Sequence, residues 1–527
     1  MTSTLAQKAR ALATVVLLVA AATALPAAPA SAAELVPIAG AGSTWSQNAI
    51  RQWAANVKKN NIEVSYAGTG SSAGRREFAQ NTVDFAVSEI PYGLKDSALG
   101  RPADSRPTRK MTYMPIVAGG TAFMYNLKIN GRRVTNLRLS GETVAKMFTG
   151  AIKMWNDPAI RADNPGLTLP ARQVVPVVRA DGSGTSAQFT LWMSKQHPDL
   201  WNAYCARHGK TPPCDLTSYY PQKASEGFVA RTGSDGVAGY VRQDQNEGTI
   251  TYVEYSYAKN ASFPVAKILN QAGYYVEPTA RSVAVALLNA QIETSNPNSD
   301  DYLTQKLDNV YASNDKRAYP LSSYSYMILP TAVERPITLD KGFTLAKFSY
   351  YLLCEGQQQA ESLGYSPLPM NLVQAGYAQV KRIPGVVEEP ANLRTCNNPT
   401  FSTNGQNTLA VTAPQPPECD RKGGPQQCST GTAGATEETT TGGGTGATTG
   451  PSGAADPSGE AVDPVTGEPA GGGSGGEYVA GVPVSLDAAR GWRTHHTIMV
   501  VAGLLLLALV LGPPLMARRL RRPGGRP

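Results

Sequence analysis

Arg179-Ala-Asp-Gly-Ser-Gly-Thr-Ser186 joins an apolar run, Val174–Val178, to an amphipathic segment, Ser186–Lys195. The change of pattern predicts a strand, a glycine-rich loop and a helix. Such a loop presents unpaired backbone N–H groups at the positive end of the helix dipole, and its hydroxyls add further donors. Arg179 supplies a planar guanidinium that suits two anion oxygens, and Asp181 is placed to hold it. Together these groups predict a site for a small multivalent oxyanion.

Two other loops have the same setting, because each follows an apolar run and precedes a helical pattern. They are Gly40-Ala-Gly-Ser-Thr-Trp45 and Gly68-Thr-Gly-Ser-Ser-Ala-Gly74. Any one of the three loops is compatible with a simple Ser or Thr helix cap. Three loops of the same chemistry favour one shared anion site over three separate caps.

The alternation of apolar runs and amphipathic segments extends over residues 34–401 and predicts an α/β domain. Val36–Ala39, for example, precedes the helical pattern of Gln47–Lys59. Beyond this domain the composition changes to Gly, Thr, Ser and Pro, with little to bury. We therefore expect a disordered low-complexity linker over residues 402–495.

Both ends of the chain carry targeting patterns. Lys8 and Arg10, followed by an apolar run and a small-residue cleavage pattern, predict a signal peptide over residues 1–33. Residues 497–517 are apolar over the length of a membrane-spanning helix, and the basic tail 518–527 should remain in the cytoplasm. We expect a single-pass protein of the cell membrane, with its binding domain on the extracellular side.

Charge and cysteine content limit the classes of function. The formal net charge is +8, but much of it sits in clusters at the two ends, and no basic stripe with interleaved aromatic residues predicts nucleic-acid binding. Six cysteines indicate an oxidising compartment. Fifteen complete pairings are possible, and the sequence does not choose among them. Pairing of sequence neighbours would give Cys205–Cys214, Cys354–Cys396 and Cys419–Cys428. Since there is no CxxC motif, a metal site is not expected.

Two enzyme classes find little support in the motifs. Gly68-x-Gly-x-x-Ala73, with Glu89 about twenty residues on, fits a dinucleotide fingerprint, but an exported protein meets little nicotinamide cofactor. Ser183 is not in a Gly-x-Ser-x-Gly elbow because position 181 is Asp, and the chain has only four histidines. We expect a protein that is not an enzyme and needs no cofactor.

At its glycine-rich loops the sequence resembles the phosphate-binding subunit of bacterial phosphate ABC transporters, in the periplasmic-binding-protein-like superfamily. The resemblance runs in order over nearly all of 35–395. Its motifs are Gly40–Thr44, Tyr66–Ser72, Asn81–Phe85, Gly150–Asn156, Asn164–Leu167, Val178–Ser186, Gly239–Val241, Tyr252–Ala258 and the Tyr319–Leu321 region. It implies a two-lobed α/β fold of type II with the ligand in the cleft between the lobes. Lobe 1 would comprise about 34–115 and 320–401, and lobe 2 about 116–319.

Matched motif to motif, the resemblance also implies the phosphate ligands. They are Thr44, the backbone of Trp45, Ser71, Glu89, Arg179, Ser183, Gly184 and Thr185. Asp181 would orient Arg179. The family usually has Phe where this chain has Trp45, which matters little because only the backbone N–H is needed.

Glu89 departs from the family pattern, which usually has Asp at this position. In the family that carboxylate accepts a hydrogen bond from the proton on phosphate and repels sulfate, which has no proton to offer. Glu is one methylene longer and carries the same functional group. Either the cleft accommodates the longer side chain, or Glu89 points elsewhere and selectivity weakens; an exposed surface carboxylate is the simplest alternative.

The resemblance implies an extracytoplasmic protein that captures inorganic phosphate for the permease and ATPase of an ABC transporter. Its C-terminal helix would attach it to the membrane. Two alternatives remain open: a membrane-tethered phosphate sensor or scavenger without a transporter, and a binder of another oxyanion such as sulfate or arsenate.

Overall fold

The computed structural model describes residues 33–435, apart from 97–99, 103, 105, 300, 390–395, 397, 403–404 and 425–426. The expected signal peptide, most of the expected linker and the basic tail lie outside these residues. The expected membrane span at 497–517 does so as well. Among the helices of the described residues, none combines the length and the hydrophobicity of a membrane-spanning segment.

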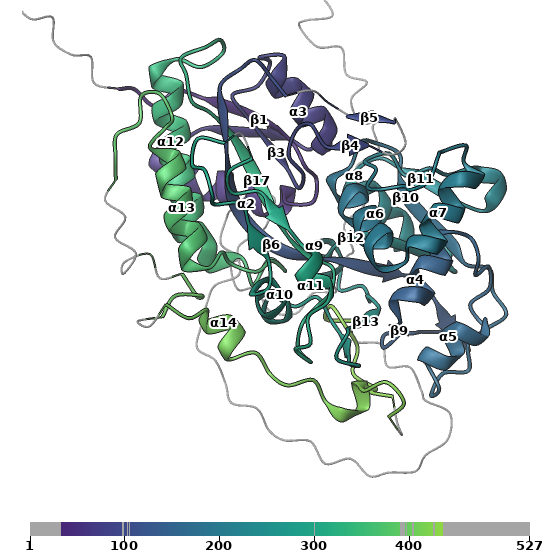
Figure 1. Cartoon of the computed structure of the whole chain (residues 1–527). Helices are drawn as coiled ribbons and strands as arrows, with labels where there is room; N and C mark the ends of the chain where they lie inside the picture. Colours follow the sequence, from purple (N-terminus) through teal and green to yellow (C-terminus); the bar gives the residue numbers. More distant parts are fainter. Residues whose placement is uncertain are drawn as a thin grey trace, which may run out of the picture. The chain divides into compact units, whose positions relative to one another are not determined.

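One eight-stranded sheet organises the described residues (Figure 1). Its strand order is β11-β10-β12-β6-β17-β3-β1-β2. The strands, in chain order, are β1 (Ile38–Gly42), β2 (Val64–Ala67), β3 (Phe85–Ser88), β6 (Met111–Tyr125), β10 (Val175–Arg179), β11 (Val229–Arg231), β12 (Thr249–Glu254) and β17 (Ser322–Pro330). All fifteen residues of β6 are buried, as is typical of a central strand covered on both faces.

The long strand β6 belongs to two lobes. Its first part pairs antiparallel with β17, and β17 continues to β3 and the parallel strands β1 and β2. Its last part, from Thr121, pairs with β12, which continues to the parallel strands β10 and β11. The chain therefore crosses between the lobes within β6 and returns at β17. This arrangement confirms the expected two-lobed α/β fold.

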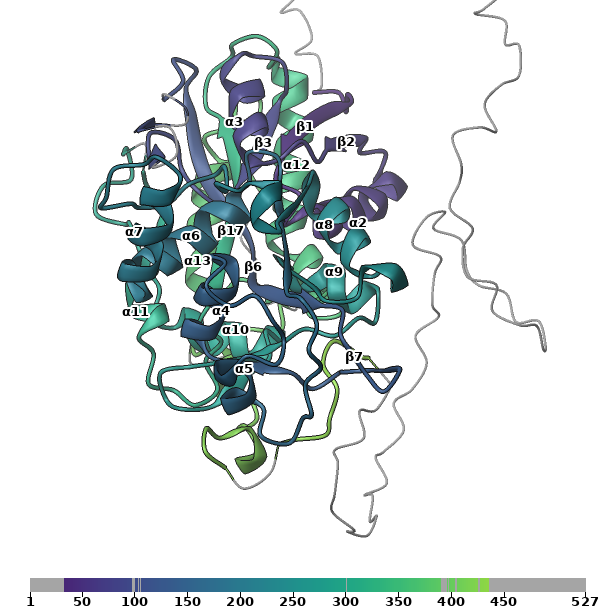
Figure 2. The same ribbon diagram turned by 90° about the vertical axis from the view of Figure 1, so that its right-hand side faces the viewer.

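Helices cover the sheet within each lobe (Figures 1 and 2). Lobe 1 carries α2 (Gln47–Val57), α3 (Ser71–Ala79), α12 (Leu339–Leu353) and α13 (Met370–Val380). Lobe 2 carries α4 (Gly141–Phe148), α6 (Gly184–Gln196), α7 (Pro198–Arg207), α8 (Gly233–Val241) and α9 (Tyr255–Asn260). The helices α2, α3, α6 and α8 each begin shortly after a strand of the sheet. Their N-termini therefore lie at the carboxyl ends of parallel strands, where α/β proteins usually place their ligands.

The segment after residue 401 packs on the domain, so the boundary expected there is wrong. Helix α14 (Thr408–Val411) contacts α10 (Ala280–Leu287), and Leu409 is buried. Farther on, Lys267 Nζ lies 2.6 Å from the Asp420 carboxylate, and Thr432 Oγ1 donates to Val265 O at 2.7 Å. These polar contacts with lobe 2 hold a segment whose composition predicts a linker. Among the described residues, the chain therefore packs on the domain as far as residue 435.

Two of the three neighbouring cysteine pairs are disulfide-bonded. They are Cys354–Cys396 in lobe 1 and Cys419–Cys428 in the C-terminal segment. Cys205 and Cys214 are both buried and are not bonded to each other. The pKa of the Cys205 thiol is raised, mainly because the thiol is buried and to a smaller extent because Cys214 lies beside it.

Candidate functional site

The three glycine-rich loops meet between the lobes. We call them loop 1 (Gly40–Trp45), loop 2 (Gly68–Gly74) and loop 3 (Arg179–Ser186). Loops 1 and 2 touch through Gly70 N, which donates to Gly42 O at 2.8 Å. Loops 2 and 3 touch through Ser72 N, which donates to Gly182 O at 3.1 Å. Three loops far apart in the sequence thus form one site, as their shared chemistry predicted.

The close approach of loops 2 and 3 requires a glycine at position 70. Its φ of +91° is a conformation that side-chain-bearing residues rarely adopt. A Cβ there would also lie 2.5 Å from Asp181 Oδ2 and 2.9 Å from Gly182 O. Any side chain at position 70 would therefore push loop 3 of lobe 2 away from loop 2 of lobe 1.

Loop 1 reaches across to the start of α8. The hydroxyl oxygens of Thr44 and Ser234 lie 2.9 Å apart, and Ser234 N donates to Thr44 Oγ1 at 3.1 Å. Tyr257 OH donates to the carbonyl oxygen of Thr44 from α9. The N–H of Trp45 donates to Ser43 Oγ at 2.9 Å. Of the expected residues of loop 1, Thr44 therefore contacts lobe 2, whereas the N–H of Trp45 is bonded within the loop.

Arg179 is buried with only 3% of its surface exposed, and Asp181 holds one edge of its guanidinium. Arg179 Nε donates to Asp181 Oδ1 at 2.8 Å, and Nη2 donates to Oδ2. The other edge faces α8, since Nη1 lies 3.4 Å from Ser234 Oγ. The expected orienting role of Asp181 therefore has a matching geometry.

The charge of Asp181 is stabilised although it lies largely inside the protein. Burial pushes the pKa of its carboxyl upward, but the hydrogen bonds and charge of Arg179 act in the opposite direction. Gly233 N adds a hydrogen bond to Asp181 Oδ1 at 2.9 Å. Together these donors outweigh burial and lower the pKa of Asp181 below its usual value.

The N-terminus of α6 supplies further donors. Ser183 caps the helix, because its Oγ accepts from Ser186 N at 3.2 Å, and Gly184 N donates to Ser71 Oγ at 3.1 Å. The hydroxyl of Thr185 is buried and has no hydrogen-bond partner within the described part of the chain. A buried hydroxyl without a partner is costly unless a ligand satisfies it.

Glu89 points into the site and is not a surface carboxylate. It is 1% exposed. Its Oε2 accepts from Ser71 Oγ at 2.7 Å, and its Oε1 lies 2.9 Å from Ser325 Oγ. A Cβ added to Gly184 would lie 2.0 Å from Glu89 Oε2, so this oxygen sits against the N-terminus of α6.

Two residues at the site are absent from the sequence-based set, Ser234 and Ser325. Ser234 follows the short strand β11 in a Thr-Gly-Ser sequence at a helix start, so the rule that identified the other loops would also have found it. Ser325 lies inside β17, in a run of serines and tyrosines. No local pattern marks it, because it reaches the site through strand pairing.

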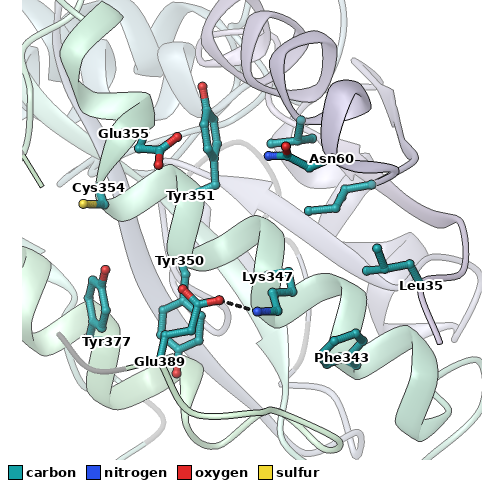
Figure 3. A pocket seen from close by; sticks show the side chains of 12 residues that line it. Leu35, Asn60, Phe343, Lys347, Tyr350, Tyr351, Cys354, Glu355, Tyr377 and Glu389 are labelled. Carbon is teal, nitrogen blue, oxygen red and sulfur yellow. Dashed lines mark hydrogen bonds and ion pairs between the residues drawn. The ribbon is translucent and has the colours of Figure 1, made fainter. Parts of the chain in front are cut away.

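Other features of the described residues fit a small anion less well. No cluster of potential metal ligands occurs among these residues. A cavity of about 480 Å³ lies in lobe 1 beside α12 (Figure 3). Its lining includes Tyr351 and the carboxylates of Glu355 and Glu389, and its lysine, Lys347, is already paired with Glu389 at 2.6 Å. Carboxylates at such a cavity would repel a dianion.

Comparison with known proteins agrees with this geometry. The model of the PBP superfamily domain matches residues 27–355. A phosphate-binding protein of Xylella fastidiosa is 32% identical over 356 residues, which cover 64% of this chain and 83% of that protein. The chain belongs to the phosphate-binding protein family. A second relative, from Pasteurella multocida, is 31% identical over 65% of this chain and 90% of its own length.

A solved structure supports the fold of this family member. The ancestral soluble variant of the human phosphate-binding protein has a TM-score of 0.50 and 18% identity. The match covers 69% of this chain and 98% of that one. The segment that matches the superfamily model, residues 27–355, contains all three loops together with Ser234 and Ser325.

Proposed function

We propose that this protein captures inorganic phosphate outside the cytoplasm and delivers it to the permease and ATPase of an ABC transporter. The observation that carries the proposal is the convergence of three glycine-rich loops on one buried guanidinium between two lobes. Membership of the phosphate-binding protein family supports the same ligand.

The donors around the site suit a tetrahedral dianion. Arg179 contributes the positive charge, and the N-termini of α2, α3 and α6 contribute N–H groups and partial positive charge. The proposed ligands of phosphate are Thr44, the N–H of Trp45, Ser71, Arg179, Ser183, the N–H of Gly184 and Thr185. Asp181 keeps the guanidinium in its orientation. Burial strengthens each of these interactions, because little water is present to screen them.

Glu89 is the proposed selector among oxyanions. At neutral pH phosphate carries at least one proton and can donate it in a hydrogen bond to a carboxylate. Sulfate carries none, so its oxygens would face Glu89 Oε2 without a hydrogen between them. A buried pair of acceptors without a proton is strongly unfavourable. The buried position of Glu89 beside Gly184 supports this role for the longer side chain.

Attachment to the membrane is proposed from the sequence. The apolar run 497–517, followed by Arg518 and Arg519, supports a single C-terminal span with the binding domain outside the cell. The Gly- and Thr-rich residues between 436 and 495 would then connect the domain to that span.

Calorimetry on the full chain, purified in detergent and stripped of bound anion, tests the proposal. Phosphate should bind at one saturable site, and sulfate should bind far more weakly. Arsenate, which keeps a proton at neutral pH, should compete with phosphate. Binding of sulfate alone, or of neither anion, would overturn phosphate capture.

A further inference from the structure

Ser325 and Glu89 are neighbours across two antiparallel strands. Strand β17 pairs with β3 so that Tyr326 lies opposite Ser88. Because the strands are antiparallel, Ser325 then lies opposite Glu89, which directly follows β3. Residues directly opposite each other place their side chains in contact. Ser325 Oγ lies 2.9 Å from Glu89 Oε1, and both residues are buried.

An irregularity in the sheet lies at this position. Ser325 pairs with Val117 of β6, whereas Tyr326 pairs with Pro115, so Ile116 is an extra residue on β6. Such bulges bend a strand locally and change the direction of the side chains beside it. Ser325 stands at this bulge, close to the place where β6 passes from one lobe to the other.

A second hydroxyl lies within hydrogen-bond distance of Ser325. Ser46 precedes α2 but makes no side-chain capping bond, and its Oγ lies 3.0 Å from Ser325 Oγ. The Ser325 hydroxyl has a single hydrogen, and Glu89 Oε1 has none to give when it is ionised. Ser325 is the donor in both contacts, and its one hydrogen favours the carboxylate of Glu89, because a charged acceptor makes the stronger hydrogen bond.

The two carboxylate oxygens of Glu89 consequently have different tasks. Oε1 is held by Ser325 on the side of β17. Oε2 faces Ser71 and the N-terminus of α6, where the anion is proposed to bind. A glutamate side chain has more rotatable bonds than an aspartate, so it needs an additional contact to keep one oxygen at a fixed place.

We propose that Ser325 is a positioning residue that sets the selectivity for phosphate over sulfate, by fixing the carboxylate of Glu89 with Oε2 facing the anion. This inference rests on the phosphate-binding function proposed above. Without the Ser325 hydroxyl, Glu89 can rotate away from the anion and no longer excludes an anion that lacks a proton.

The test compares the affinities of the full chain for phosphate and sulfate by calorimetry at neutral pH. Ser325→Ala should lower the ratio of the sulfate Kd to the phosphate Kd by at least about tenfold, which corresponds to one hydrogen bond to a charged group. Ser323→Ala is the matched control: it removes a buried hydroxyl of the same strand that has no hydrogen-bond partner among the described residues. Its ratio should equal that of the wild type.

A double-mutant cycle separates positioning from general damage. If Ser325 acts through Glu89, then adding Ser325→Ala to Glu89→Gln should not change the ratio of the sulfate Kd to the phosphate Kd any further. Thermal unfolding of each variant confirms that it is folded. A wild-type protein that does not bind phosphate overturns the proposed function and this inference with it. Tight phosphate binding by the wild type, with the same ratio in Ser325→Ala or an additive effect in the double variant, overturns the role of Ser325 alone.

Discussion

Thr44 and Ser234 hydrogen-bond to each other from opposite lobes, with their hydroxyl oxygens 2.9 Å apart. Two further pairs join the lobes beside them. Gln47 Nε2 donates to Asp235 Oδ2 at 3.0 Å, and Asn48 Nδ2 donates to Ser256 Oγ at 2.6 Å. The lobes are therefore closed on each other around the site. An anion can reach the buried Arg179 only when these contacts separate, and their strength should influence how fast it leaves.

Removal of the Ser234 hydroxyl should weaken this closure. We expect Ser234→Ala to raise the phosphate Kd by about 2- to 10-fold, as for the loss of a neutral hydrogen bond, mainly through faster dissociation. Stopped-flow fluorescence of the buried tryptophans can measure that rate. Ser362→Ala, whose hydroxyl bonds only to the nearby Gln359 O, is the control. Unchanged dissociation in Ser234→Ala would contradict a role in closure.

Arg179 should be indispensable for affinity but not for folding. We expect Arg179→Ala to raise the phosphate Kd by about 100-fold or more, because hydrogen bonds from a guanidinium to an anion are among the strongest in proteins. Arg231, its partner residue on the neighbouring strand β11, is exposed and provides the control substitution Arg231→Ala. Calorimetry measures both. Equal affinity of the two variants, with intact circular dichroism, would show that Arg179 does not bind the anion.

The ion pair of Asp181 predicts a pH dependence of stability. Its pKa is lowered in the folded protein, so it contributes stability above its unfolded pKa. That contribution should be lost as the pH falls through the folded pKa. Asp181→Asn should therefore lower the free energy of unfolding at neutral pH and flatten its acid decline. Denaturant unfolding at several pH values provides the measurement, and parallel curves for the two proteins would contradict the prediction.

The C-terminal segment should stabilise lobe 2 through Lys267 and Asp420. The side chain of Asp420 is 4% exposed and that of Lys267 is 11% exposed. Lys267→Ala leaves a buried carboxylate without its cation, which should lower the free energy of unfolding by about 3–5 kcal/mol. Lys381→Ala breaks an exposed pair with Glu388 and should leave the denaturant midpoint nearly unchanged. Similar denaturant midpoints for both variants would contradict this difference.

The sequence predicted that the three loops meet, because their shared pattern is local. Loops 1, 2 and 3 each show a strand, glycines, hydroxyls and a helix within a few residues, and the structure brings all three together. Ser234 has the same local pattern but is not among the residues predicted from the sequence. The contact between Ser325 and Glu89 is of another kind. It depends on the pairing register of β17 with β3 and on the extra residue at Ile116, neither of which periodicity reveals.

The packing of residues 402–435 on the domain also cannot be predicted from the local sequence pattern. Residues 402–435 contain few apolar side chains, so their composition resembles that of the linker that follows. They are held by hydrogen bonds from side chains of lobe 2 to their backbone carbonyls and by buried polar pairs. Examples are Asn136 Nδ2 with Cys428 O at 2.7 Å and Arg138 Nη1 with Cys419 O at 2.7 Å. Such contacts depend on the shape of lobe 2, which only the folded structure provides.

The place where the chain leaves the domain has a mechanical consequence. Thr432 is bonded to Val265 and Thr135 of lobe 2, so whatever follows residue 435 is attached to that lobe. A force applied to the chain after residue 435 would act on the hydrogen bonds of lobe 2 and would not strain the contacts between the lobes. Lobe 1 would remain free to move while lobe 2 is held, so such a force would leave the opening and closing of the site unaffected.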